Sequence, residues 1–172
     1  MRLPHLLPLL ILASCTVALH AVTPAHSIIG THVPEFVIDD QFEHPWNASM
    51  FRGGVTVYVL SDRSGYEYSG NWTTPLLARF RNSPVRFVPV ADVQSVPGFL
   101  KGLIRGRFRD EFNYSVLMDW DGVLIKAFNM QEDVTNLVIA NKSGIVEHVA
   151  FGTGTSAQVE SFAKRLEVIL AQ

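Results

Sequence analysis

The stretch VTVYVL at residues 55–60 decides the fold, because it is rich in β-branched residues and almost wholly apolar. Such a run is typical of a strand that is buried on both faces of a sheet. We therefore expect these residues to lie at the centre of the sheet. The segment that follows, SDRSGYEYSG at residues 61–70, is polar and carries two glycines. It is predicted to be a loop.

Apolar runs and helical patterns alternate around this strand. Residues 35–40 and 85–90 have strand patterns, and residues 72–80 and 99–112 have helical character. Two short apolar runs, 116–118 and 123–125, flank DWDG at residues 119–122, which predicts a turn between them.

The last third of the chain is the most regular. Residues 137–140 and 145–149 flank NKSG at 141–144, which predicts an antiparallel hairpin. Thr155 and Gln158 have the spacing of a capping box, so a final helix is expected to begin there. Its apolar stripe comprises Val159, Phe162, Ala163, Leu166 and Ile169. This stripe is expected to pack on the sheet.

The composition indicates one compact domain. It also argues against nucleic-acid binding and against thiol chemistry in residues 28–172. The chain has 172 residues, 48% of them hydrophobic, and a formal net charge of -2. Because the net charge is not positive, nucleic acid is not an expected partner. The single cysteine is Cys15, so residues 28–172 contain no thiol for a disulfide, a metal site or a nucleophile.

The first 27 residues predict export. Arg2 precedes an uncharged, mostly apolar run at residues 3–22, and no acidic residue occurs before Glu35. We interpret residues 1–27 as a signal peptide, a lipoprotein segment or an uncleaved membrane anchor. Residues 12–15 resemble a lipobox, which would leave Cys15 lipidated. All three outcomes place residues 28–172 outside the cytoplasm, in the periplasm or in the secreted fraction.

Taken together, the order of these elements resembles the redoxin branch of the thioredoxin superfamily. That branch includes alkyl hydroperoxide reductase/thiol-specific antioxidant proteins and periplasmic thiol-disulfide proteins. FVIDDQ at residues 36–41 is similar to the first strand of the family. Exported YtfJ-type proteins are a closer comparison, through AFNMQED at residues 127–133 and the hairpin after it. The resemblance implies an α/β, thioredoxin-like fold over residues 28–172, with a central mixed sheet flanked by helices.

The departures from this family concern its redox site. Redox-active relatives carry a nucleophilic cysteine in the loop after the central strand. One alignment register places Ser64 and Glu67 at the two cysteine positions, and another places Glu67 and Gly70 there. The family's cis-proline would fall near residues 134–135, where no proline occurs. We therefore expect a redox-inactive relative with no catalytic residue and no cofactor.

The degenerate redox loop is the candidate contact surface. Its candidate residues for binding a ligand or partner are Asp62, Arg63, Ser64, Tyr66, Glu67 and Thr135. A solvated loop with local ion pairs is the alternative. No metal is expected, because the three histidines after the N-terminal segment are scattered in the sequence. A basic face on the helix at 99–112 would suit acidic partners or lipid headgroups, and a solvated helix face is the alternative.

The sequence thus favours an exported accessory or binding protein of the cell envelope. Its expected partner is an envelope or secreted protein or a small ligand, with membrane contact only through the N-terminal segment. Two alternatives stay open. One is a redoxin-family thiol oxidoreductase or peroxidase relative that uses a partner's thiols, and the other is a lipid-anchored structural protein.

Overall fold

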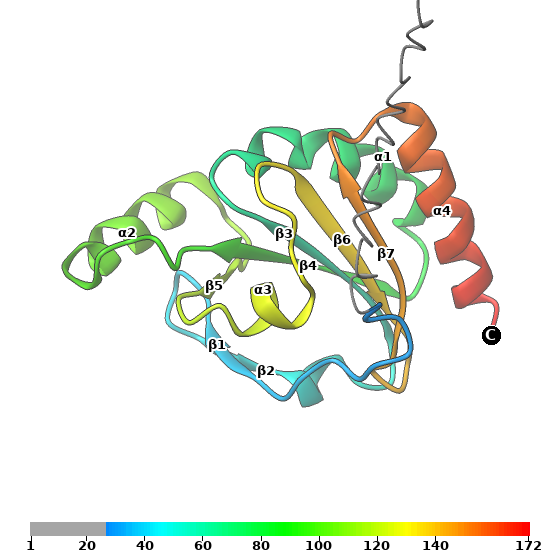
Figure 1. Ribbon diagram of the computed structural model, residues 1–172, viewed down its shortest axis with the longest axis horizontal. Helices are drawn as coiled ribbons and strands as arrows, with labels where there is room; N and C mark the ends of the chain where they lie inside the picture. Colours follow the sequence, from blue (N-terminus) through cyan, green and yellow to red (C-terminus); the bar gives the residue numbers. More distant parts are fainter. Residues whose placement is uncertain (1–26) are drawn as a thin grey trace, which may run out of the picture.

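The computed structural model describes residues 27–172, which fold around a mixed five-stranded sheet (Figure 1). Its strands are β3 (Val55–Ser61), β4 (Val85–Asp92), β5 (Leu117–Asp119), β6 (Thr135–Ala140) and β7 (Val146–Gly152). The strand order is β5-β4-β3-β6-β7. Strand β3 is parallel to β4 and antiparallel to β6, and it lies at the centre as predicted.

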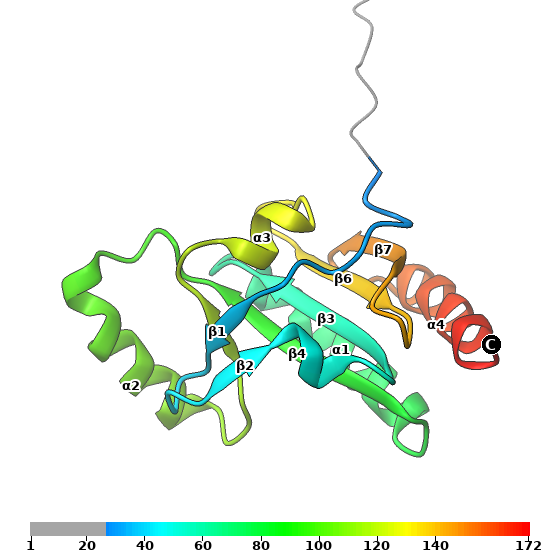
Figure 2. The same cartoon turned by 90° about the horizontal axis from the view of Figure 1, so that it is seen from below.

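Alternating side chains of β3 build two cores, one on each face of the sheet. On one face, Val55, Val57 and Val59 pack against α1 (Ser69–Phe80) and α4 (Ser156–Leu170). On the other face, Tyr58 and Leu60 pack against the N-terminal segments and α3 (Val123–Ala127). In Figure 2, β1 and β2 lie in front of the sheet and α1 lies behind it. The expectation of an α/β fold with a central mixed sheet and flanking helices is confirmed.

A small hairpin covers the second face. Strands β1 (Val37–Asp39) and β2 (Pro45–Asn47) pair antiparallel and lead into the 3₁₀ helix η1 (Ala48–Phe51). The fully buried carboxylate of Asp40 holds the turn between the strands, because it accepts hydrogen bonds from the amides of Phe42 and His44 and from the indole of Trp46. The strand predicted at 35–40 is therefore shorter, and its pairing with β2 was not foreseen.

The prediction for residues 116–125 was only half right. Strand β5 forms, but the second apolar run is the short helix α3 and not a strand. The carboxylate of Asp119 accepts hydrogen bonds from the amides of Val123, Leu124 and Ile125, which satisfies the free donors of the first helical turn. Gly122 takes a left-handed conformation just before the helix, with φ of 68°.

The hairpin of β6 and β7 and the final helix follow the prediction closely. Helix α4 begins after Thr155, whose capping box with Gln158 is present. Phe162, Ala163, Leu166 and Ile169 are buried, and Val159 is partly buried against them. Among residues 27–172, no helix is both long and apolar enough to cross a membrane.

Helix α2 (Lys101–Glu111) lies apart from these layers. It forms where the sequence predicts a helix, after the 3₁₀ turn η3 (Gly98–Leu100), and it projects from one side of the molecule (Figure 1). None of its residues is buried. Its apolar side chains therefore do not enter either core, and Leu103 is 53% exposed.

Candidate functional site at the end of strand β3

The candidate loop lies at the carboxyl end of the central strand. Strand β3 ends at Ser61, and a 3₁₀ helix, η2 (Gly65–Tyr68), leads directly into α1. Because β6 runs antiparallel to β3, the start of β6 at Thr135 lies at the same end of the sheet. This end of an α/β sheet is where ligands commonly bind.

Asp62 ties the loop to the segment that precedes β6. One carboxylate oxygen accepts the amide of Gly65 at 2.6 Å, and the other accepts the amide of Asp133 at 2.8 Å. The carbonyl oxygen of Asp62 also accepts the amide of Tyr66 at 3.0 Å. Its carboxylate is thus occupied by the protein's own backbone, so Asp62 shapes the site and is a poor candidate for ligand contact.

Thr135 fixes the loop from the opposite side. Its buried hydroxyl donates to the carbonyl oxygen of Gly65 at 2.7 Å and lies 3.3 Å from the hydroxyl of Ser69, which can donate to it. Gly65 packs so closely that an added Cβ atom would lie 2.3 Å from the carbonyl oxygen of Val134. The loop and residues 133–135 therefore form one rigid unit.

The remaining candidates face solvent. Arg63, Ser64 and Glu67 are exposed, and their side chains form no hydrogen bond or ion pair within residues 27–172. The structure thus divides the six predicted residues into two groups. Asp62 and Thr135 build the loop, and the other four, including the exposed Tyr66, are presented by it.

Tyr66 connects the loop to helix α2. Its hydroxyl donates to the carboxylate of Glu111 at 3.1 Å. Its ring packs edge-on against the ring of Phe112, with 5.8 Å between the ring centres. Partial burial, and then the hydrogen bond and negative charge of Glu111, raise the pKa of Tyr66 to about 12. Tyr66 is therefore a neutral phenol at physiological pH. Sequence reasoning missed Glu111 and Phe112, because nothing in their spacing links them to residue 66.

The positions that correspond to the redox cysteines carry no sulfur in either register. Ser64 immediately precedes η2, Glu67 lies within it and Gly70 lies in the first turn of α1. Cys15 lies outside the described residues. Among residues 27–172 there is also no group of three or more His, Cys, Asp or Glu side chains that could hold a metal ion. The chemistry available at the loop is hydrogen bonding, charge and aromatic contact.

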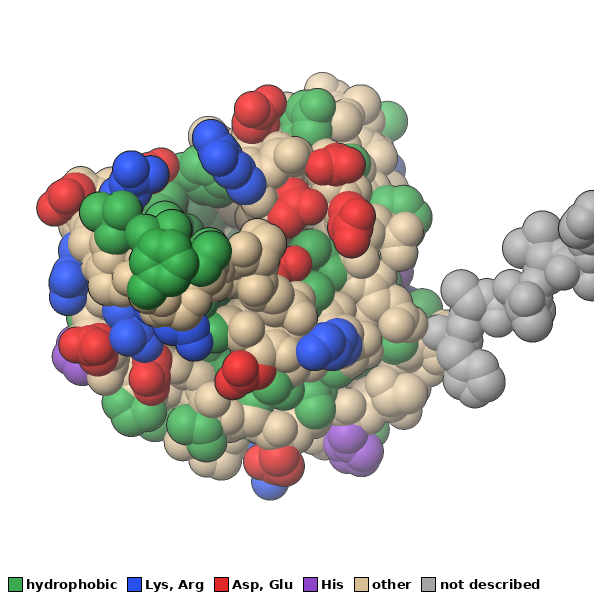
Figure 3. Space-filling model, turned by 60° about the vertical axis from the view of Figure 1, so that its left-hand side comes forward, with side chains coloured by type: hydrophobic (Ala, Val, Ile, Leu, Met, Phe, Trp, Pro, Cys, Tyr) green, Lys and Arg blue, Asp and Glu red, His purple; other side chains and the backbone are tan. Residues whose placement is uncertain are grey.

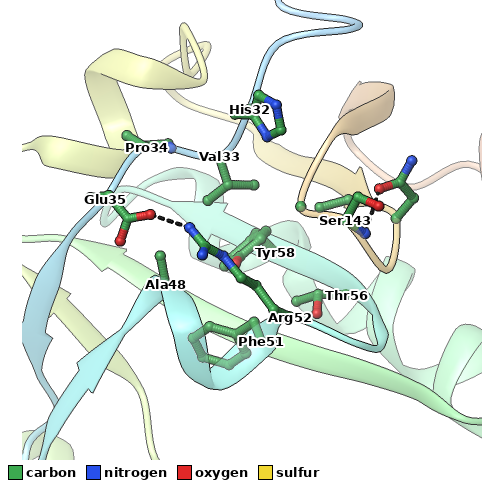
Figure 4. Close-up of a pocket in the computed structure, with 13 residues that line it drawn as sticks. His32, Val33, Pro34, Glu35, Ala48, Phe51, Arg52, Thr56, Tyr58 and Ser143 are labelled. Atoms are coloured by element: carbon green, nitrogen blue, oxygen red, sulfur yellow. Dashed lines mark hydrogen bonds and ion pairs between the residues drawn. The ribbon is translucent and has the colours of Figure 1, made fainter.

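A second hollow, which the sequence analysis did not predict, lies at the opposite end of β3. Its volume is about 300 Å³, and Tyr58, Phe51 and Thr56 line it (Figure 4). Arg52 and Glu35, which form an exposed ion pair, also line this hollow. Burial raises the pKa of Tyr58, so its phenol stays neutral. Because this hollow is formed by the beginning of β3, it is separate from the loop at 62–68.

The comparisons with known proteins identify the fold. No family model matches the sequence, and no curated protein is similar to it. A thiol:disulfide interchange protein of the thioredoxin family from Chlorobium tepidum has a TM-score of 0.57 and 16% identity, over 82% of this chain and 97% of that one. The pneumococcal exposed lipoprotein thioredoxin of Streptococcus pneumoniae has a TM-score of 0.57 and 12% identity, over 76% and 98% of the two chains.

A third similar structure has no stated activity. It is an uncharacterized conserved protein from Geobacillus kaustophilus, with a TM-score of 0.65 and 13% identity over 83% of this chain and 82% of that one. At such low identity these structures establish the thioredoxin-like fold alone. They confirm the expected fold, whereas the redoxin branch, the YtfJ type and the roles of the loop residues stay predictions.

Proposed function

We propose that this chain is an exported, thioredoxin-fold binding or accessory protein that contacts its partner through the loop at 62–68 without exchanging thiols. The observation that carries the proposal is the loop itself. It occupies the end of the central strand, it is held in one shape by Asp62 and Thr135, and it presents polar and aromatic side chains but no sulfur.

The lack of a thiol argues against electron transfer by residues 28–172 acting alone. Disulfide exchange requires a thiolate that attacks a disulfide sulfur. A serine hydroxyl such as that of Ser64 is far harder to ionise than a thiol and forms no stable disulfide. In addition, the Ser64 hydroxyl has no hydrogen-bond partner within residues 27–172, so no base is positioned on it.

The rigid shape of the loop supports binding. A surface that is already ordered loses less conformational entropy when a partner docks. Arg63, Glu67 and Tyr66 offer a cation, an anion and an aromatic hydroxyl within five residues. Arginine and tyrosine are enriched among the residues that dominate protein interfaces. A protein partner in the envelope or the secreted fraction therefore suits this surface.

Export is the part of the proposal that rests on residues 1–27. Their apolar pattern supports a signal peptide or an anchor, and one similar structure belongs to an exposed lipoprotein thioredoxin. If Cys15 carries a lipid, metabolic lipid labelling of the full chain will disappear in Cys15→Ala. Labelling that persists in this variant would exclude lipidation at Cys15.

The alternative is a thiol oxidoreductase relative that works with a partner's thiols, which the names of similar structures favour. Insulin-reduction and peroxide-consumption assays on residues 28–172 separate the two readings. We expect no turnover above background. Clear turnover by the purified domain would overturn the binding proposal.

The contact surface is tested by capture from an envelope extract. The bait with Arg63→Ala and Tyr66→Ala should lose proteins that the wild-type bait retains. A matched control bait carries Arg81→Ala and Leu77→Ala, which also removes one exposed cation and one exposed apolar side chain. Recovery of the same proteins with all three baits would show that the loop is not the contact surface.

A further inference from the structure

Helix α2 exposes apolar side chains that the fold does not use. Phe99, immediately before the helix, is 86% exposed and is the most exposed of the large hydrophobic residues at positions 27–172. Leu103 follows four residues later and is 53% exposed. Phe99 belongs to the 3₁₀ turn η3, and Leu103 belongs to the first turn of α2, which follows η3 directly. Phe99 and Leu103 therefore form one outward-facing apolar pair, which we call the α2 tip.

Basic side chains flank the α2 tip. Helix α2 carries four basic residues and, at its C-terminal end, the two acidic residues Asp110 and Glu111. Arg107 lies four residues after Leu103, on the same face of the helix, whereas Arg109 lies four residues after Arg105; both Arg107 and Arg109 are exposed. Neither arginine forms an ion pair within residues 27–172. Their charges are thus available to an external anionic surface.

The inner side of the helix explains how the α2 tip is held outward. The guanidinium of Arg105 pairs with Asp39 and Glu43, and it also stands over the ring of Trp120 at 5.7 Å. The ammonium of Lys101 lies 4.9 Å from the centre of the same ring. Through these ion pairs and cation-π contacts, one side of α2 packs against the β1–β2 turn and Trp120. The opposite side is left facing solvent.

The shape of this surface distinguishes a membrane from a protein partner. Figure 3 brings the α2 side of the molecule forward and shows apolar side chains gathered on a projecting knob, with basic and also some acidic side chains around it. A projecting apolar knob with flanking arginines suits insertion between lipid headgroups. The arginines would then meet lipid phosphates, and anionic lipids would add to the attraction.

We propose that the α2 tip is a peripheral membrane-binding element that inserts Phe99 and Leu103 into an anionic lipid surface. This contact is additional to any anchoring through the N-terminal segment, and it does not depend on the proposed role of the loop at 62–68. The apolar pair and the arginines have effects on membrane binding that can be measured separately. The apolar pair sets the depth of insertion, and Arg107 and Arg109 make the binding dependent on anionic lipid and on salt.

The first test is vesicle co-sedimentation of residues 28–172, which contain every described helix and strand. Vesicles of equal parts phosphatidylglycerol and phosphatidylcholine should bind the domain, and pure phosphatidylcholine vesicles should bind at least about fivefold less. The Phe99→Ser/Leu103→Ser variant should bind anionic vesicles about tenfold less than the wild type. The matched control is Leu77→Ser/Val168→Ser, which changes two other exposed apolar residues, on α1 and α4, and should bind as the wild type does.

The second test measures insertion directly. Because residues 28–172 contain no cysteine, Phe99→Cys and Leu77→Cys each give a single site for an environment-sensitive dye. On anionic vesicles the emission of the dye at position 99 should shift to the blue, whereas the dye at position 77 should not respond. High salt should reverse the shift.

Three results would overturn the proposal. They are the absence of vesicle binding by the wild type, equal binding by the tip variant and its control, and equal dye responses at both positions. If Phe99→Ser/Leu103→Ser instead changes sedimentation of the domain without lipid, the α2 tip is a contact between copies of the chain. Circular dichroism of each variant establishes that the fold is intact.

Discussion

The hydroxyl of Thr135 donates a 2.7 Å hydrogen bond to the carbonyl oxygen of Gly65, which joins residues 70 positions apart in the sequence. This contact fixes the loop after β3 against the start of β6. The hydroxyl is buried, so its loss would leave the carbonyl oxygen without a partner in a place that water does not readily reach.

Replacing Thr135 by valine should destabilise the protein by about 1–3 kcal/mol, because the shape is kept while the hydrogen bond to Gly65 is lost and the hydroxyl of Ser69 loses its acceptor. Thr56→Val is the matched control. Thr56 is also a buried strand residue, but its hydroxyl has no hydrogen-bond partner in the part of the chain that the structure describes. This control should be neutral or stabilising. Urea unfolding of both variants measures the difference, and equal losses would show that the Thr135 bond contributes little.

Gly65→Ala should cost about 1–3 kcal/mol and displace the loop, because the new methyl group would overlap the carbonyl oxygen of Val134. Gly70→Ala is the comparison. Gly70 lies in helix α1, and an added Cβ atom there would meet nothing within 4 Å. Alanine at this position should stabilise the helix by about 0.5–1 kcal/mol. Thermal or urea unfolding should therefore move in opposite directions for the two variants.

Asp119→Ala should lower the free energy of unfolding by about 1–3 kcal/mol, because three amides at the start of α3 lose a charged acceptor. Asp121→Ala removes an exposed carboxylate two residues later, which makes no hydrogen bond within residues 27–172. It should change stability by less than about 0.5 kcal/mol. Chemical denaturation gives both values, and equal effects would contradict the role of Asp119 as the cap.

The turn between β1 and β2 should make stability depend on acid pH through Asp40. Burial by itself would raise the pKa of this carboxyl, but hydrogen bonds from Ser115, His44, Trp46 and Phe42 outweigh burial and hold it below its usual value. The ionised form thus stabilises the fold at neutral pH. This contribution fades as the pH falls below about 3.9, the value in an unfolded chain, and is lost through the lower pKa of the folded state.

The measurement for Asp40 is urea unfolding of the wild type and Asp40→Asn at pH 7 and at pH 3. The stability difference between the two proteins should be large at pH 7 and should shrink at pH 3, because the unfolded wild-type chain binds a proton at this carboxyl there. A difference that does not change with pH would show that Asp40 acts through shape and not through charge.

The sequence predicted those parts of the fold whose signals are local. The apolar run at 55–60 identified the central strand, and the capping box of Thr155 with Gln158 identified the start of α4. Helix α3 was missed because its five residues are too few to show helical periodicity. Only the contact of Asp119 with the next turn distinguishes this helix from a strand, and that contact depends on three-dimensional geometry.

The structure shows how the candidate loop residues are arranged, and their role in binding stays a prediction. Resemblance to a family placed residues 62–67 and Thr135 at one end of the sheet, and the structure brings them together there. Their division into residues that build the loop and residues that face solvent could not be predicted. It depends on Asp133 and Val134, which meet the loop from about 70 residues away.

The isolation of helix α2 has a dynamic consequence. A helix of eleven residues without a buried side chain gains little from tertiary packing, and isolated helices of this length are marginal in water. It should therefore open locally while the sheet stays intact. In native-state amide hydrogen exchange, the backbone amides of α2 should lose protection well before those of β3 and β6, so this part of the molecule can rearrange without any cost to the rest.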